Sequence, residues 1–273
     1  MGKHEIVFCL GLGISAGLFV GLLFVNPNEG KILFSELVLQ LSGSSGKFPL
    51  GCSVTELTGF AMRLVPAFVG ECCFGICFYK RFCTASVYVF SRCVQKRRWY
   101  RLEIGHIICR VAVFQGSILA GAILSVLLRF PIVMDNMVIA VFYWLSWIIW
   151  TGTMILAMNL TAVYVGSSFA FAGIITLQIL FLALMGTGYS TTASGEGILR
   201  IMMVCNPIAR LVTGWHNGYG TALGRVIPAN DFMFSPCHTI IMFSVIFAAV
   251  SFAGEWLIMN RDILVTNMEE GAW

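Results

Sequence analysis

The sequence predicts an all-α integral membrane protein with six transmembrane helices and cytoplasmic N and C termini. Residues of the AVILMFWYC set make up 58% of the 273 residues and charged residues only 11%, whereas a soluble domain carries about 25% charged residues. The mean hydropathy of +0.87 leaves too little polar surface to cover a soluble globule of this length. Lipid must therefore supply the outer surface.

Six apolar runs reach the length of about 20 residues that a helix needs to cross a bilayer. They cover residues 6–25, 57–79, 104–128, 137–158, 162–185 and 239–259. The first run follows Lys3, but it is too long for the core of a signal peptide and no A-x-A-like cleavage site follows, so we expect it to be retained. No repeat marks a second domain, and residues 1–273 are expected to form a single transmembrane domain.

Basic residues set the orientation, because loops rich in Lys and Arg stay in the cytoplasm. The expected loop 80–103 holds seven of the 17 basic residues, namely Lys80, Arg81, Arg92, Lys96, Arg97, Arg98 and Arg101. This loop and both termini are therefore expected inside, and the loops 26–56, 129–136 and 186–238 outside. The net charge of +4 is too small to indicate a nucleic-acid partner.

Three glycines in the first run are candidates for helix packing. Gly13, Gly17 and Gly21 repeat at four-residue spacing, which stacks them on one helix face. Small residues at this spacing let another helix approach closely. The partner is either a helix of the same subunit or a helix of a second subunit, and the pattern favours neither.

Glu71 and Arg110 are charges inside expected spans, where an unpaired charge is costly. Glu71 lies eight residues before Tyr79, the inner end of the second span, and Arg110 lies six residues after Ile104, the inner start of the third. With a rise of about 1.5 Å per residue, their depths differ by roughly 3 Å. We therefore expect a Glu71–Arg110 ion pair, which either fixes helix register or serves as a proton or substrate relay.

Two expected loops, 80–103 and 186–238, contain apolar or aromatic residues in patterns that simple connecting loops lack. The inner loop 80–103 mixes its basic residues with aromatic ones such as Trp99, so it either lies on the anionic inner leaflet or docks into a groove of a cytosolic partner. The outer segment 186–238 holds a short apolar stretch, a break at Asn206-Pro207, and an amphipathic stretch that ends at Trp215-His216. This pattern is typical of an interfacial or re-entrant helix pair, and the alternative is a lid that merely covers the bundle.

Motif searches give no indication of catalysis. The sequence has no G-x-S-x-G, H-E-x-x-H or Walker A motif, and its four histidines are scattered. We therefore expect no enzyme activity, no catalytic residue, no metal site and no cofactor on this chain. Of the ten cysteines, only Cys52, Cys205 and Cys237 fall in expected exterior loops, and the sequence leaves open whether two of them form a disulfide.

The arrangement resembles the permease subunits of type-2 ABC exporters. It shares six spans, an inner basic loop between the second and third, a short inner turn between the fourth and fifth, and a long broken outer element before the sixth. The N-P-containing stretch from Asn206-Pro207 to Trp215-His216 is similar to the element ahead of the last helix in that family. The stretch Lys96-Arg97-Arg98-Trp99-Tyr100 looks like the small permeases of bacteriocin and modified-peptide export or immunity. No fused nucleotide-binding domain and no long N-terminal amphipathic helix accompany these features.

The resemblance implies a type-2 ABC exporter-like bundle in the bacterial cytoplasmic membrane. It implies that the coupling loop to a separate ATP-binding subunit lies at Arg92, Lys96, Arg97, Arg98, Trp99 and Arg101. ATP and Mg would then sit on that subunit, and a second permease would complete a homo- or heterodimer surrounded by membrane lipid. An extracellular gate would comprise Asn206, Pro207, Arg210, Trp215 and His216.

The expected function is therefore ATP-driven export of a hydrophobic or amphipathic, bacteriocin-like peptide out of the cell or the membrane. Two other classes of function stay open at this point. One is a stand-alone membrane immunity or sensor protein that binds such a peptide without transport. The other is an intramembrane enzyme, which the failed motif searches disfavour.

Overall fold

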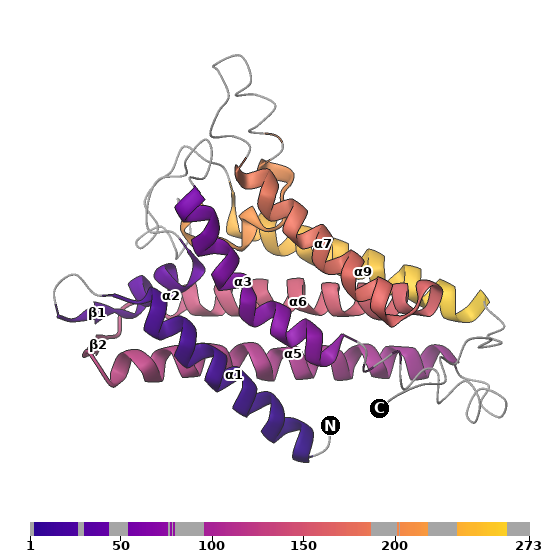
Figure 1. The fold of residues 1–273 in the computed structure, drawn as a ribbon, viewed down its shortest axis with the longest axis horizontal. Coiled ribbons are helices and arrows are strands. Elements are labelled where there is room, and N and C mark those ends of the chain that lie inside the picture. Colours follow the sequence, from indigo (N-terminus) through magenta and orange to yellow (C-terminus); the bar gives the residue numbers. More distant parts are fainter. Residues whose placement is uncertain are drawn as a thin grey trace.

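Six membrane-length helices form the protein, as Figure 1 shows. The structure is a computed structural model that describes residues 3–26, 30–43, 54–75, 77, 79, 96–186, 201, 203–217 and 234–260. The long helices are α1 (Lys3–Phe24), α3 (Val54–Phe74), α5 (Lys96–Leu127), α6 (Val138–Val165), α7 (Ser167–Gly186) and α9 (Pro236–Asn260). Each is long and apolar enough to cross a bilayer, so the chain is a mostly helical, multi-pass membrane protein.

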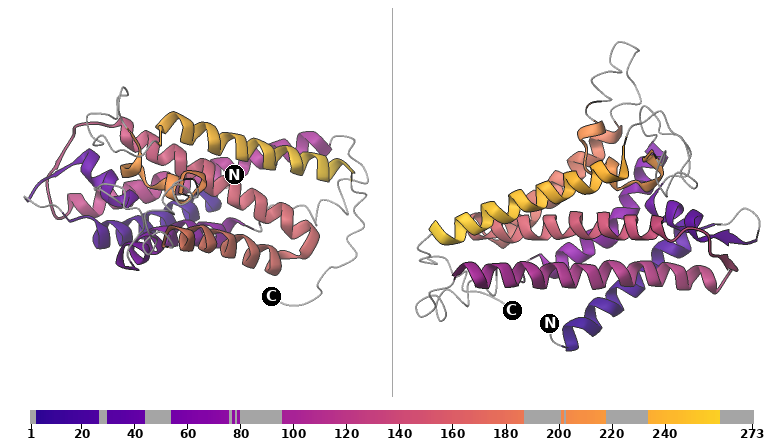
Figure 2. Two further views of the ribbon diagram at one scale, coloured as in Figure 1. Left: turned by 90° about the horizontal axis from the view of Figure 1, so that it is seen from above. Right: turned by 180° about the vertical axis from the view of Figure 1, so that it is seen from behind.

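The helices run back and forth between two ends of the bundle. We call the end where α5 begins, with Lys96 to Arg101, the basic end, and the end that carries the strands β1 (Ile32–Leu33) and β2 (Ile132–Val133) the strand end. Figures 1 and 2 show α5 and α6 side by side, with α7 and α9 on the α6 side of this pair. α1 packs along α5, and α3 contacts α1, α5, α6 and α7. Most of α7 and α9 is left uncovered by the rest of the protein, which suits helices that face lipid.

Three of the predicted span boundaries are wrong, all toward the basic end: the start of the third span, the end of the fourth and the start of the fifth, which lies at Ser167 rather than at residue 162. α5 begins at Lys96 rather than near residue 104, so the last part of the predicted inner loop is helix. α6 continues through Asn159 to Val165, and the turn follows at Gly166, whose φ of +84° suits glycine. Asn159 does not end the helix because its side chain is satisfied there: Nδ2 donates to the carbonyl of Ile155 at 2.7 Å, and Oδ1 accepts from the amide of Tyr79 at 2.9 Å.

A short helix at the strand end was not predicted from the sequence. α2 (Phe34–Ser42) directly follows β1, and Leu37 and Val38 on it are fully buried. β1 pairs in parallel with β2, with Ile32 opposite Ile132. Asp135 lies just beyond β2 and accepts hydrogen bonds from the amide and the hydroxyl of Ser35, which satisfies the first turn of α2. This end of the bundle is therefore closed by ordered structure.

The contact between α1 and α5 is the most extensive in the described part of the chain. Gly13, Gly17 and Gly21 all face α5, so the glycine row packs within the subunit. A Cβ atom at Gly17 would overlap the carbonyl oxygen of Ile118, and one at Gly21 would overlap the Ser125 hydroxyl. Close backbone approach of this kind is how helices associate where no hydrophobic force drives them together.

Arg129 fastens the strand end of this contact. Its Nη2 donates to the carbonyls of Gly21, at 2.8 Å, and Val25, at 3.4 Å. These carbonyls belong to the last turn of α1, whose partial negative charge favours a cation. The two helices are thus held by glycine packing along their length and by a capping guanidinium at one end.

We expect Gly17→Ala to destabilise the folded protein by about 1–3 kcal/mol, because the methyl group would push α1 away from the Ile118 carbonyl. Gly11→Ala is the matched control, since a Cβ at Gly11 on the same helix meets nothing within 4 Å. The measurement is resistance to SDS-induced unfolding of both variants in mixed micelles. Equal loss of stability in the two variants, or none in either, would contradict the packing of α1 on α5.

Candidate functional site

The predicted ion pair between Glu71 and Arg110 is wrong, because each side chain has another partner. Nη2 of Arg110 lies 3.2 Å from both carboxylate oxygens of Glu5 on α1. Glu71 on α3 instead accepts a hydrogen bond of 2.7 Å from Nε2 of Gln178 on α7. Arg110 pairs with α1 because α5 packs most closely on α1, and the prediction missed Glu5 by starting the first span after it.

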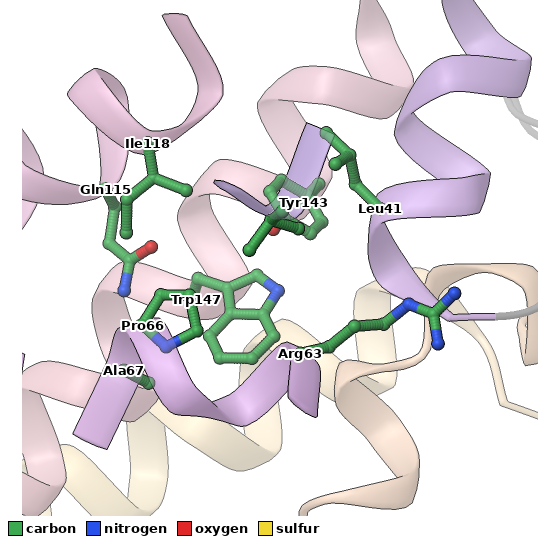
Figure 3. Close-up of a pocket in the computed structure, with 9 residues that line it drawn as sticks. Leu41, Arg63, Pro66, Ala67, Gln115, Ile118, Tyr143 and Trp147 are labelled. Carbon is green, nitrogen blue, oxygen red and sulfur yellow. The ribbon is translucent and has the colours of Figure 1, made fainter. Parts of the chain in front are cut away.

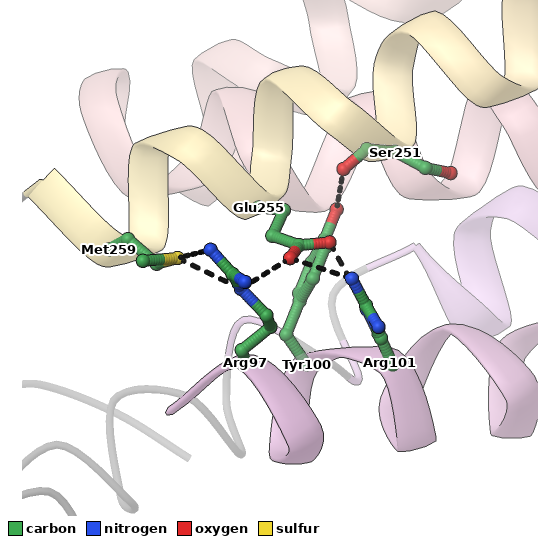
Figure 4. A network of polar contacts seen from close by, with 6 residues as sticks. All are labelled: Arg97, Tyr100, Arg101, Ser251, Glu255 and Met259. Atoms are coloured by element: carbon green, nitrogen blue, oxygen red, sulfur yellow. Dashed lines mark hydrogen bonds and ion pairs between the residues drawn. The ribbon is translucent and has the colours of Figure 1, made fainter. Parts of the chain in front are cut away.

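At the basic end, ion pairs fasten α5 to α9 (Figure 4). Nε of Arg97 lies 2.7 Å from Oε1 of Glu255, and Nη2 of Arg101 lies 3.0 Å from the same oxygen. One turn along α9, the Sδ of Met259 accepts from Arg97 Nη2 at 3.1 Å. The carboxylate of Glu255 is thus shared by two guanidinium groups, which fixes the start of α5 against the last turns of α9.

The same contact extends toward the bundle interior through Tyr100. This side chain is fully buried, and its hydroxyl donates to the carbonyl of Ser251 on α9 at 3.2 Å. Gly254 permits the approach, since a Cβ there would overlap the Tyr100 hydroxyl. The first turns of α5 are therefore helical and packed on α9.

Other residues of the predicted coupling loop divide into two groups. Arg98 is exposed at the start of α5, and Lys96 and Trp99 beside it are half-buried. Arg92 and the rest of residues 80–95 lie outside the described residues. Arg97, Arg98 and Arg101 are all exposed, but Arg97 and Arg101 are engaged with Glu255, which leaves Arg98 as the exposed guanidinium outside this ion pair.

At the strand end, the described part of the predicted gate is buried rather than interfacial. Residues 206–216 form two short 3₁₀ turns, η3 (Ala209–Leu211) and η4 (Thr213–Trp215), in place of the second helix of the expected pair. Nδ2 of Asn206 donates to the carbonyl of Phe181 on α7 at 2.6 Å, and Oδ1 accepts from the amide of Ile208 at 2.9 Å. Pro207 is buried, and the fully buried Trp215 packs edge-on against Phe60 of α3. We call residues 206–216 the plug.

A polar chain joins the plug to the first turn of α9. Nη1 of Arg210 donates to the hydroxyl oxygen of Thr239 at 3.3 Å, and that hydroxyl lies 2.9 Å from Nε2 of His216. Nδ1 of His216 faces the carbonyls of Val212 and Thr213, at 3.1 and 3.2 Å, so it carries the hydrogen. Nε2 is then the acceptor of the Thr239 hydroxyl hydrogen, and the imidazole is neutral.

The electrostatics of the plug agree with this arrangement. Burial lowers the pKa of His216 to about 4, and the nearby charge of Arg210 acts in the same direction. Burial also lowers the pKa of Arg210, whose guanidinium stacks over the ring of Phe234 at 4.9 Å. Protonation of His216 would place a second cation beside Arg210 and remove the acceptor of the Thr239 hydroxyl. The plug is therefore built for a neutral histidine.

A small cavity lies between α1, α2, α3, α5 and α6 (Figure 3). Gln115, Tyr143 and Trp147 contribute polar atoms to its lining, and Arg63 lies at its edge. Nε of Arg63 donates to the carbonyl of Gln40, and its guanidinium lies 4.0 Å from the ring centre of Phe24. The space suits a water molecule and is far too small for a peptide.

Within the described residues, no group of three or more His, Cys, Asp or Glu side chains could hold a metal ion. Cys205 and Cys237 are free thiols, so they form no disulfide with each other, and Cys52 lies outside the described residues. The polar clusters described above join helices and the plug to one another.

Comparisons with known proteins find no match for this chain among family models, curated proteins or solved structures. Its function must therefore be argued from the arrangement of its own residues.

We expect the contribution of His216 to the stability of the protein to be lost as the pH is lowered from about 6.5 to about 4, because the unfolded chain binds a proton at His216 that the folded plug excludes. Above pH 6.5 both states are neutral at this residue, and this contribution is constant. His216→Gln should flatten the loss in that window. The measurement is the unfolding midpoint against pH, with His238→Gln on the same end as the control; an unchanged profile in His216→Gln would contradict the neutral assignment.

Proposed function

We propose that the protein is the permease subunit of an ATP-driven exporter, working with a separate ATP-binding subunit and a second permease in the bacterial cytoplasmic membrane. The observation that carries this proposal is the form of α5. It runs unbroken for 32 residues from the basic Lys96–Arg101 turns to Leu127 at the strand end, a length of about 48 Å. A force applied at the basic end is therefore transmitted by one rigid element across the membrane.

The clamp at Glu255 supports the same proposal. Because Arg97 and Arg101 fasten the start of α5 to α9, a displacement of α5 also displaces α9. α9 in turn begins beside the plug, where Thr239 is hydrogen-bonded to Arg210 and His216. In this proposal the basic end receives the motion of the ATP-binding subunit, and residues 206–216 close the exit at the opposite end.

Charge distribution gives the expected docking surface. Arg98 is exposed on the first turn of α5, where it is available to an acidic groove of a cytosolic partner. Arg97 and Arg101 hold the helix that presents it, and we assign them a positioning role. Arg92, Lys96 and Trp99 complete the proposed coupling surface. The proposed substrate is a hydrophobic or amphipathic peptide that enters from the membrane, along the apolar faces of α7 and α9.

We expect Arg98→Glu to abolish copurification of an ATP-binding subunit from mild detergent while leaving the permease folded, because it reverses the exposed charge without touching the Glu255 clamp. Lys31→Glu is the matched control, since Lys31 is an exposed cation at the strand end. The measurement is an affinity pull-down of each tagged variant, with quantitative mass spectrometry of the partners.

Two results of this pull-down would contradict the proposal. Retention of the ATP-binding subunit by Arg98→Glu at the level of the control would contradict the assignment of the coupling surface to Arg98. Recovery of the unaltered protein alone, under conditions that preserve a known exporter, would favour the stand-alone immunity or sensor protein instead.

A further inference from the structure

A buried carboxyl group lies between α3 and α7 without a counter-ion. Glu71 and Gln178 are both 0% exposed. Nε2 of Gln178 donates to Oε2 of Glu71 at 2.7 Å. The other two side-chain oxygens, Oε1 of Glu71 and Oε1 of Gln178, are buried and have no hydrogen-bond partner within the described part of the chain. Each of the two hydrogen-bonded side chains thus keeps one buried acceptor without a donor.

The helices around Glu71 supply no cation to balance a negative charge. α7 contains no ionisable side chain, and α6 contains only the phenols of Tyr143 and Tyr164. On α5, Arg110 is bound to Glu5 of α1. The remaining ionisable groups on the helices that pack against α3, and on α3 itself, are Lys3, His4, Cys9, Glu56, Arg63, Cys72, Cys73, Lys96, Arg97, Arg98, Tyr100, Arg101, Glu103, His106 and Cys109.

Among the described residues, the one hydrogen-bond partner of Glu71 is Gln178, and no described cation forms an ion pair with it. Arg63 lies two turns away on α3 and is bound to Gln40 and Phe24 at the strand end. The basic side chains in the first turns of α5 lie at the basic end, where Arg97 and Arg101 form ion pairs with Glu255. A carboxylate at this position would therefore be a bare charge inside the membrane domain, which is among the costliest arrangements that a protein can adopt.

We infer that Glu71 and Gln178 form a proton-binding site between α3 and α7. A proton on Oε1 of Glu71 turns that oxygen into a donor, and Oε1 of Gln178 is the free acceptor that it requires. The carboxylic acid and the carboxamide then form a closed pair, with one hydrogen bond in each direction. A single proton satisfies both unpartnered oxygens and removes the buried charge.

A proton suits this site better than a metal cation. Hard cations take about six to eight oxygen ligands, whereas the described residues offer two unpartnered side-chain oxygens here. The surrounding packing is also tight on the α6 side, since a Cβ atom at Gly75, one turn beyond Glu71, would overlap the sulphur of Met158. A metal ion with a shell of waters would have to displace this packing, and a proton adds no volume.

Release of the proton should weaken the contact between α3 and α7. The closed pair would lose one hydrogen bond and gain a charge. Movement of α7 away from α3 would then lower the free energy, because water could enter and solvate the carboxylate. Phe181 lies one turn beyond Gln178 on α7, and its carbonyl holds Asn206 of the plug at 2.6 Å. Proton release at Glu71 is thereby linked to the hydrogen bond that holds Asn206 of the plug to α7. This inference concerns the bundle itself and holds whether or not an ATP-binding subunit is the partner.

The test compares the pH dependence of unfolding in the full-length protein and in Glu71→Gln. The folded protein holds a proton that an unfolded chain releases above about pH 4.3, so its stability should fall as the pH rises. The expected fall in the ratio of folded to unfolded protein is about tenfold per pH unit for one proton. Glu71→Gln should remove this dependence between about pH 6 and 8, because the introduced amide can form the same closed pair at every pH. Glu56→Gln, an exposed carboxyl on the same helix, should keep the dependence.

Three results would overturn the inference. The first is an identical pH profile in the unaltered protein and Glu71→Gln. The second is a stability that depends on Na⁺ concentration at constant pH in the unaltered protein alone, which would show that a metal cation occupies the site. If Glu71→Gln fails to fold, infrared spectroscopy of the unaltered protein in lipid decides instead. A carbonyl band of a protonated carboxylic acid is expected at neutral pH, and its absence would overturn the inference.

Discussion

The structure depends on one constraint, which is that the interior of a membrane offers neither water for hydrogen bonds nor a hydrophobic force between helices. The α1–α5 contact meets this constraint with a row of glycines that brings two backbones together. Arg129 then caps the carbonyls at the end of α1, and Glu5 balances Arg110 on the same pair of helices. Once α1 and α5 are joined in this way, α6 packs along α5, and α7 and α9 pack mainly on α6.

The same constraint explains why the two ends of the bundle differ. At the basic end, water is near, and Arg97 and Arg101 share the carboxylate of Glu255 while remaining half or more exposed. At the strand end, the plug is buried, and its polar chain runs through the hydroxyl of Thr239 to a neutral His216. Ion pairs therefore join the helices at the end that we expect to meet a partner, and hydrogen bonds from Arg210 and to a neutral His216 hold the plug at the end that we expect to open.

Hydropathy alone was sufficient to locate all six membrane-length helices, because a run of about 20 apolar residues has few other structures available. The predicted Glu71–Arg110 pair was wrong because equal depth in the membrane does not specify which helices are neighbours. The glycine row of α1 packs on α5 and so brings Glu5 to Arg110, but the sequence did not show which helix the glycines would contact. The buried α2 was missed because its nine residues are too short to give a span signal. Gln178 went unnoticed as a partner of Glu71, although it is the one side-chain amide in α7 and could have been found as such.

The claim on which the functional account rests is that the basic end faces the cytoplasm, where ATP is available. The most direct measurement places a reporter on each end of the bundle in cells: green fluorescent protein fused after Trp273, and alkaline phosphatase inserted between Met134 and Asp135. The account predicts fluorescence from the first and phosphatase activity from the second, since the C-terminal helix ends at the basic end and β2 lies at the strand end. A dark first fusion together with an inactive second one would place the basic end outside and contradict the account.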